Sequence, residues 1–411
     1  MSASTDLLSA LRVEGPLATN DNSLPEEEFR LLPGPADWLD RATHAYRHPD
    51  AVAREWREGG GRVVGVLGHD VPRELVLAAG LLPIRLAPAR LLSNDAPVVG
   101  GDSPLQLTPD CQAFLDALLA GALGWIDALV IGRDSESHTK LFYGLRELLA
   151  MGEAPRLDLC FYDLVRLPTE ASARYNRVRT RQFAEVLATW SGAAPWQDAM
   201  RASVAASNAT TTLLEELADL RRARPAGLGG VDALLLDGAA MTLAPGATQD
   251  LLTAALADPP PPRPGRRVFV SGSPHDDLAL AGAIEGAGYV IVGEDHDWGD
   301  RSFAVVPETA DPLDGLVDRY HLGPPGAART GLDERARYTC HQALARGAEV
   351  VLQLCFDHDE SPEWEFPDLR DRLAAHGVPV VRARLPWPGG DPGSLARLAQ
   401  DLSTALDGPD G

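Results

Sequence analysis

The sequence predicts an α/β fold with two doubly wound parallel sheets, and three observations lead to this prediction. Short apolar strand patterns alternate with helical patterns in two separate stretches of the chain, which is typical of parallel sheets. Residues 258–265, with four consecutive prolines, form a stiff linker between the two stretches. At 411 residues the chain is also too long for one ordinary hydrophobic core.

The first stretch opens with a run of apolar and β-branched residues at 63–67, which a polar loop then ends. Pro72 suits the start of the next helix, because a first-turn residue needs no N–H group, and Gly80 suits its end. The elements expected here, in chain order, are strand 63–67, helix 73–79, strand 81–86, helix 111–122, strand 127–131, helix 140–151 and strand 158–162.

The second stretch repeats this alternation after the linker. The elements expected here are strand 267–270, helix 278–287, strand 289–292, helix 336–346, strand 348–354, helix 366–376 and strand 378–383. Helical spacing also covers residues 35–46 and much of 175–256. The sequence therefore predicts a helical N-terminal segment (1–60), a first α/β domain (61–165), a helical connecting segment (166–260) and a second α/β domain (266–411).

Composition excludes several classes of function. The net charge of −22 disfavours nucleic acid and anionic membranes as partners, because phosphate contacts need Lys and Arg. No apolar run is long enough to span a membrane, and the N-terminus lacks the pattern of a signal peptide, so we expect a cytoplasmic protein. Its four cysteines have no CxxC spacing, which argues against a disulfide scaffold or a zinc ribbon.

Titratable residues gather in the loops that follow the expected strands. These loop residues are His69, Asp70, Asp134, Ser135, Glu136, His138, His275, Asp276, Asp277, Asp295, His296, Asp297, Cys355, Asp357, His358 and Asp359. In a doubly wound sheet such loops lie at one edge and can converge on a ligand. The simpler interpretation is helix capping, which we expect for Asp134, Ser273 and Asp276. Capping does not account for the recurring histidines.

The segment at 71–86, VPRELVLAAGLLPIRL, resembles a sequence pattern of the 2-hydroxyacyl-CoA dehydratase D-component family, which includes the benzoyl-CoA reductase subunits. Four further segments resemble this family in the same order: 127–148, 213–230, 268–303 and 347–382. The resemblance implies two flavodoxin-like domains, an acyl-CoA substrate and a paralogous second subunit. It also implies a four-iron four-sulfur cluster in the interdomain cleft, which a separate ATP-dependent activator reduces.

This chain departs from the family at the cluster. Counting from the family's motifs, the three cysteine ligands fall on Gly68, Ser135 and Asp359, and Cys355 lies four residues too early. Such clusters are held by cysteine thiolates, so the family's electron-transfer chemistry is not expected to operate unchanged here.

Two explanations remain open for this departure. Either the site is rebuilt around His69, His138 and His358, with Cys355 or Asp359, as a zinc or non-haem iron centre, or the chain is a non-catalytic partner of a cluster-bearing paralogue. A simpler interpretation of the histidines is that they are solvated or bonded to carboxylates without any metal.

The resulting prediction is a 2-hydroxyacyl-CoA dehydratase-like subunit that acts on, or helps to bind, an acyl-CoA-type substrate in the interdomain cleft. The residues expected in catalysis are His69, Ser135, Glu136 and Asp295. The residues expected to bind substrate are Glu74, Arg85, Ser271, Ser273 and Arg301.

Overall fold

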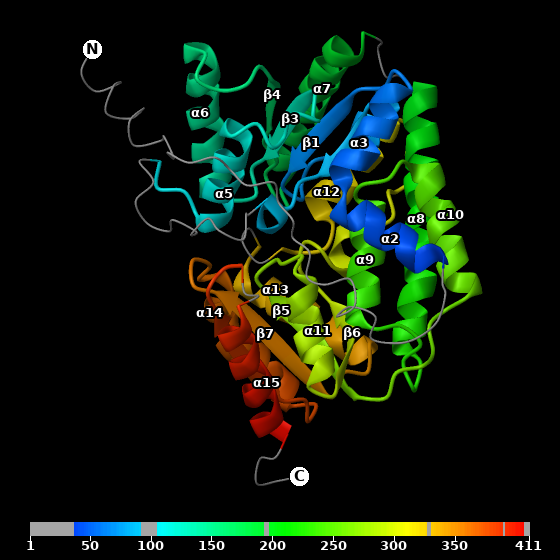
Figure 1. Cartoon of the computed structure of the whole chain (residues 1–411), viewed down its shortest axis with the longest axis vertical. Coiled ribbons are helices and arrows are strands. Elements are labelled where there is room, and N and C mark those ends of the chain that lie inside the picture. Colours follow the sequence, from blue (N-terminus) through cyan, green and yellow to red (C-terminus); the bar gives the residue numbers. More distant parts are fainter. Residues whose placement is uncertain (1–36, 92–104, 193–196, 327–329, 389–390, 407–411) are drawn as a thin grey trace.

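A computed structural model describes residues 37–91, 105–192, 197–326, 330–388 and 391–406 of the chain. Residues 1–36 of the helical N-terminal segment expected at 1–60 lie outside the described residues. Two parallel four-stranded sheets form the centre of the structure, and in Figure 1 they lie one above the other. The α/β prediction with two flavodoxin-like sheets is confirmed.

The first sheet has the strand order β2-β1-β3-β4. Its strands are β1 (Val63–Leu67), β2 (Leu82–Arg85), β3 (Ala128–Gly132) and β4 (Asp158–Tyr162). Every residue of β1 and β3 is buried, as expected for central strands covered on both faces. The helices of this half are α3 (Pro49–Glu58), α4 (Arg73–Ala78), α5 (Pro109–Leu119) and α6 (Glu136–Met151).

The second sheet has the equivalent order, β6-β5-β7-β8. Its strands are β5 (Arg266–Gly272), β6 (Tyr289–Glu294), β7 (Val350–Phe356) and β8 (Val380–Leu385). Its helices are α11 (Leu278–Gly286), α13 (Leu332–Ala345), α14 (Ser361–Ala374) and α15 (Pro392–Leu406). All strands found in the two sheets were expected from the sequence, with bounds that differ by a few residues.

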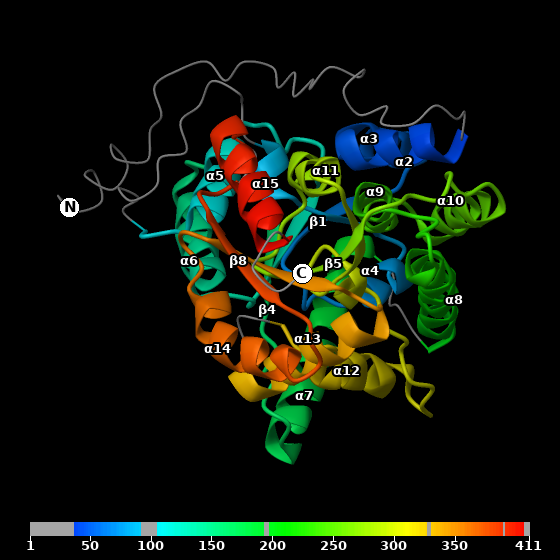
Figure 2. The ribbon, with the colours of Figure 1, turned by 90° about the horizontal axis from the view of Figure 1, so that it is seen from below.

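Helices outside the two alternating patterns join the halves. They are α2 (Asp37–Arg47), α7 (Glu170–Ser191), α8 (Gln197–Arg222), α9 (Gly230–Ala240), α10 (Pro245–Ala257) and α12 (Pro312–Leu322). Helix α12 follows β6 in sequence, yet its apolar side chains pack in the same core as β1, α4 and α7 of the first half. Figure 2 places α12 beside α7. The packing of α12 against the first half therefore holds the two halves together.

Helices α12 and α15 were not expected from the sequence, and α9, inside the expected helical connecting segment, was not recognised as a separate helix. Helix α9 is buried on all sides, between α2, α8 and β6, so it has no polar face and no helical periodicity of hydrophobic residues. Within the described residues, no helix is long and apolar enough to cross a membrane.

Candidate functional site

The candidate site lies where the two sheets face each other with the carboxyl ends of their strands. In each sheet the strand order reverses between the first and third strand, β1 and β3 or β5 and β7, and ligands bind at this switch point in open α/β sheets. The loops after all four of these strands line one pocket, whose volume is about 380 Å³. The expected convergence of the strand-end loops is therefore observed.

Two arginines, the buried Arg301 and the half-buried Arg85, form the basic wall of the pocket. Arg301 is only 4% exposed, and its Nη2 lies 2.9 Å from Asp297 Oδ1. Its Nε and Nη1 atoms are buried and have no hydrogen-bond partner among the described residues. Arg85 donates from Nη1 to the Asp297 carbonyl at 2.7 Å and lies over the Trp298 ring, 4.6 Å from its centre. The wall therefore places two guanidinium charges beside the cavity.

A histidine and a carboxyl group lie side by side in the loops after β1 and β3. The backbone N–H of His69 donates to Asp134 Oδ2, while Oδ1 of Asp134 is buried without a partner among the described residues. Burial and the nearby Asp70 carboxylate raise the pKa of Asp134. Burial, with the guanidinium groups of Arg301 and Arg85, lowers the pKa of His69 well below its usual range. His69 is therefore a neutral imidazole at pH 7.

A pair of histidines, His275 and His296, also lines the pocket. The rings of His275 and His296 lie 4.2 Å apart, and neither ring nitrogen of His275 has a hydrogen-bond partner among the described residues. Burial and the neighbouring His296 lower the pKa of His275 to about 3. His275 belongs to the loop cluster noted in the sequence but was not assigned a role. Its neutral ring lines the pocket and offers one donor and one acceptor.

Most of the predicted site residues line this pocket. They are His69, Arg85, Ser135, Glu136, His138, Asp295, Arg301, His358 and Asp359. Among them, Asp295 has both carboxylate oxygens occupied, since it accepts from Arg335 Nη2 at 2.7 Å and from Thr339 Oγ1 at 2.5 Å. That arrangement suits a positioning role better than proton transfer.

Four predicted residues, by contrast, are absent from the described lining of the pocket. Glu74, expected to bind substrate, accepts hydrogen bonds from Ser207 and Tyr320 and thereby ties α4 to α8 and α12. Ser271 is fully buried and accepts from Arg335. Ser273 donates to Asp359 Oδ2 at 2.8 Å, and the Cys355 thiol donates to the Asp359 carbonyl at 3.0 Å. The sequence shows that these residues lie near strand ends, but it does not show that their side chains point away from the pocket into the protein.

The expected helix caps also differ from those observed. Helix α6 is capped by Ser135, whose side chain accepts from the His138 N–H, and α11 is capped by Asp277. Asp134 bonds to His69 instead, and Asp276 forms an ion pair with Arg90 at 2.7 Å. These acidic groups serve contacts between loops, which sequence spacing does not show.

The residues present do not fit a cysteine-ligated iron–sulfur cluster. Gly68 has a φ angle of +109°, and a β-carbon there would lie 2.8 Å from Asp134 Oδ2. Ser135 caps α6, and Asp359 accepts from Ser273 and from the Ser361 N–H. All three positions line the pocket, but each already has another structural role. No thiol is among the described residues that line this pocket.

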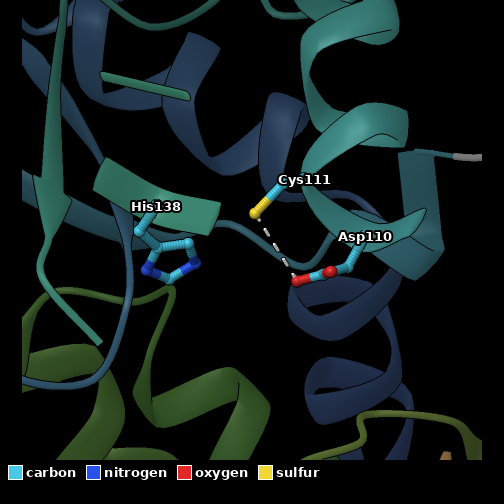
Figure 3. A group of neighbouring side chains, drawn as sticks. All are labelled: Asp110, Cys111 and His138. Atoms are coloured by element: carbon cyan, nitrogen blue, oxygen red, sulfur yellow. Dashed lines mark hydrogen bonds between the residues drawn. The ribbon is translucent and has the colours of Figure 1, made fainter. Parts of the chain in front are cut away.

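The five residues predicted as metal ligands do not gather into one donor group. Among the described residues, one set of three His, Cys, Asp or Glu side chains has all its donor atoms within 4.8 Å of one another, and it consists of Asp110, Cys111 and His138 (Figure 3). Only His138 was predicted. Asp110 and Cys111 lie in the first turn of α5; Cys111 opens the apolar helix expected at 111–122, and Asp110 precedes it.

Comparison with known proteins adds to this geometry. Residues 69–385 match the family model described as 2-hydroxyglutaryl-CoA dehydratase, D-component. The chain is 25% identical to a benzoyl-CoA reductase subunit of Thauera aromatica over 362 residues, covering 84% of this chain and 92% of that protein. It is 23% identical to the beta subunit of (R)-2-hydroxyglutaryl-CoA dehydratase from Acidaminococcus fermentans over 355 residues, covering 81% and 89% of the two chains.

Proposed function

The chain belongs to the 2-hydroxyglutaryl-CoA dehydratase D-component family, and on that premise we propose that it is one subunit of a 2-hydroxyacyl-CoA dehydratase-like heterodimer. In this proposal the chain binds the acyl end of an acyl-CoA-type substrate in the pocket between its sheets. It does not hold the four-iron cluster of the family. A paralogous subunit holds the cluster.

The main support for substrate binding is the buried guanidinium of Arg301 in the pocket wall, two of whose nitrogen atoms have no hydrogen-bond partner among the described residues. Burying a charged group without hydrogen-bond partners is costly, so a bound acceptor in the pocket is stabilising. A guanidinium can donate charge-assisted hydrogen bonds to a carboxylate or to a thioester carbonyl. The cavity volume of about 380 Å³ falls within the range of small-molecule sites and accommodates an acyl group, with the bulk of CoA outside.

The remaining pocket residues set the polarity around the acyl group. His69 and His275 are neutral at pH 7, because both pKa values are lowered. Each imidazole therefore offers one donor and one acceptor to a hydroxyl or a carbonyl oxygen. Arg85 is held by the Asp297 carbonyl and the Trp298 ring, which keeps its charge at the base of the wall.

The names of both relatives that match over most of their length describe subunits, which supports assembly with a paralogue. The replacement of the cluster ligands at Gly68, Ser135 and Asp359 supports a division of labour in which electron transfer belongs to the other subunit. In the alternative, a non-catalytic scaffold, the chain would pair with that subunit but would bind no acyl-CoA.

Calorimetric titration with (R)-2-hydroxyglutaryl-CoA tests substrate binding on the full chain, purified without oxygen and assayed for iron and sulfide. We expect saturable binding, no iron at cluster stoichiometry, and affinity at least about tenfold lower for Arg301→Gln, since a charge-assisted hydrogen bond contributes roughly 1.5–3 kcal/mol. Arg174→Gln is the matched control, because Arg174 is exposed on α7 and pairs with Glu170 in the same helix.

Three outcomes are decisive. Equal affinity of Arg301→Gln and wild type contradicts the assigned pocket. Absence of binding to acyl-CoA alone and in the presence of a co-purified paralogue supports the scaffold interpretation instead. Four irons with matching sulfide would show that the chain does hold the cluster, and would refute the proposed division of labour.

A further inference from the structure

We propose that Asp110, Cys111 and His138 bind a single zinc ion at the edge of the pocket, with His358 as the fourth ligand. This site differs from the histidine centre expected from the sequence, which used His69 and Cys355. It does not depend on the proposed substrate or on the heterodimer.

The three ligands come from the amino-terminal ends of two helices that meet beside the first sheet. Asp110 and Cys111 lie in the first turn of α5, and His138 lies in the first turn of α6. Figure 3 shows the Cys111 sulfur and the Asp110 carboxylate on the same side of the His138 ring. Their donor atoms lie within 4.8 Å of one another. Zinc bonds of about 2.0–2.3 Å at tetrahedral angles need donor separations of about 3.5 Å, so side-chain shifts of about 1 Å close the site.

The His138 ring is already oriented as in many metal sites. Its Nδ1 lies 3.0 Å from the Gly132 carbonyl, the oxygen at the end of β3. Since a carbonyl can only accept, Nδ1 carries the proton and Nε2 has its lone pair free. A carbonyl partner that fixes the tautomer of a ligand histidine is the usual outer-shell contact of metal-bound imidazole. His138 is also 8% exposed, so its ring is held in place by packing.

An unpartnered carboxylate oxygen supplies an independent indication of a bound cation. Oδ1 of Asp110 is inaccessible to solvent and lacks a hydrogen-bond partner among the described residues. The two side chains approach each other, with His358 Nε2 3.8 Å from Asp110 Oδ1. Buried polar atoms are normally satisfied, so each orphan needs an explanation such as an ion. A cation held by Asp110 satisfies this oxygen, and His358 faces it with Nε2, the nitrogen that we assign as the fourth ligand.

The donor set selects the metal. One sulfur, two imidazoles and one carboxylate are all ligand types of zinc, which is borderline-soft and tetrahedral. Calcium and magnesium are excluded as preferred ions, because they require mostly oxygen donors. Because His358 lies between β7 and α14, the ion would connect the second half to helices α5 and α6 of the first.

Metal titration of the full chain, after dialysis against a chelator, tests the proposal. We expect one zinc per chain by mass spectrometry of the metal content. Cobalt in its place should give a thiolate-to-cobalt charge-transfer band, which reports directly on a sulfur ligand. Cys111→Ser should abolish that band. Asp110→Asn and His138→Gln should weaken zinc binding by at least about tenfold, the lower limit seen when even an outer-shell partner is lost.

Matched variants separate this site from its competitors. Cys355→Ser and His69→Ala remove the thiol and imidazole of the centre expected from the sequence, and they should leave both zinc affinity and the cobalt band unchanged. Loss of the band in Cys355→Ser, or its survival in Cys111→Ser with native circular dichroism, would overturn the assignment. Unchanged affinity in His358→Ala would refute the fourth ligand. If wild type bound zinc no more tightly than the Asp110→Asn variant does, the site would be refuted.

Discussion

Glu365 offers the sharpest test of the electrostatics beside the pocket. Glu365 lies on α14 and is fully buried. Neither of its carboxylate oxygens has a hydrogen-bond partner among the described residues. The nearest cation, Arg335, is 3.8 Å away and is already bonded to Asp295. Burial raises the pKa of Glu365 to about 8. The nearby Arg335 guanidinium lowers this pKa, but less than burial raises it, and the Asp295 carboxylate raises it further. Glu365 is thus held as a neutral acid at pH 7.

The sign of the pH dependence follows from this raised pKa. Between about pH 4.5 and about pH 8 the folded chain keeps a proton on Glu365 that the unfolded chain releases. The free energy of unfolding therefore contains a contribution that is present below this window and is lost as the pH rises through it. Since each tenfold change in proton affinity corresponds to about 1.4 kcal/mol, the loss amounts to at most about 5 kcal/mol.

Glu365→Gln removes the ionisable group while keeping its shape, so it should abolish this loss. Urea unfolding at about pH 5 and about pH 9 measures the effect. We expect the variant to match wild type within about 1 kcal/mol at the lower pH and to exceed it by several kcal/mol at the higher pH. Glu334→Gln, on the exposed surface of α13, is the control and should follow wild type at both values. Parallel pH profiles for wild type and Glu365→Gln would show that Glu365 is ionised in the folded state, and the reasoning would fail.

Two further substitutions test the supports of the site. Arg221 is 1% exposed, and its Nη2 lies 2.7 Å from Glu294 Oε1. Burial alone would raise the pKa of Glu294, but the charges of Arg221 and His296 lower it to about 2. Arg221→Met should cost about 3–5 kcal/mol of unfolding free energy at pH 7, because it leaves a buried carboxylate unpaired, and a urea midpoint close to wild type would contradict this. Gly68→Ala should destabilise by about 1 kcal/mol more than Gly80→Ala: both positions have positive φ, but only at Gly68 does the new carbon meet another side chain, Asp134. Equal thermal shifts would refute that difference.

The parallel sheets and their order of elements could be predicted because local patterns specify them. The run at 63–67 coincides with β1, and the run at 158–162 coincides with β4. The run of β1 is continuous and apolar because both faces of this central strand are covered, and the loop after it is polar. The rule that ligands bind at the switch point then placed most candidate residues at one pocket before their distances were known.

Side-chain direction and long-range partners could not be predicted in the same way. Glu74 occupies a family motif beside the candidate loop, yet it points to α8 and α12, which are separated from it by more than a hundred residues. Cys111 and His138 come together because α5 packs against α6. The sequence of neither helix alone predicts this packing. Helix α9 was missed because full burial removes the periodicity that reveals a helix.

The three positions expected to hold the cluster ligands lack thiols, and each also makes a different contact within its loop. At Gly68 the backbone has taken a conformation that favours glycine, and the carboxylate of Asp134 fills the space that a side chain would need. The hydroxyl of Ser135 holds the N–H of His138, so a cysteine there would weaken the cap that positions the proposed zinc ligand. Asp359 anchors Ser273 at the opposite switch point. Restoring the three cysteines would therefore disturb three separate contacts without recreating a cluster site. These three contacts agree with the proposal that this subunit binds substrate and that its partner carries out electron transfer.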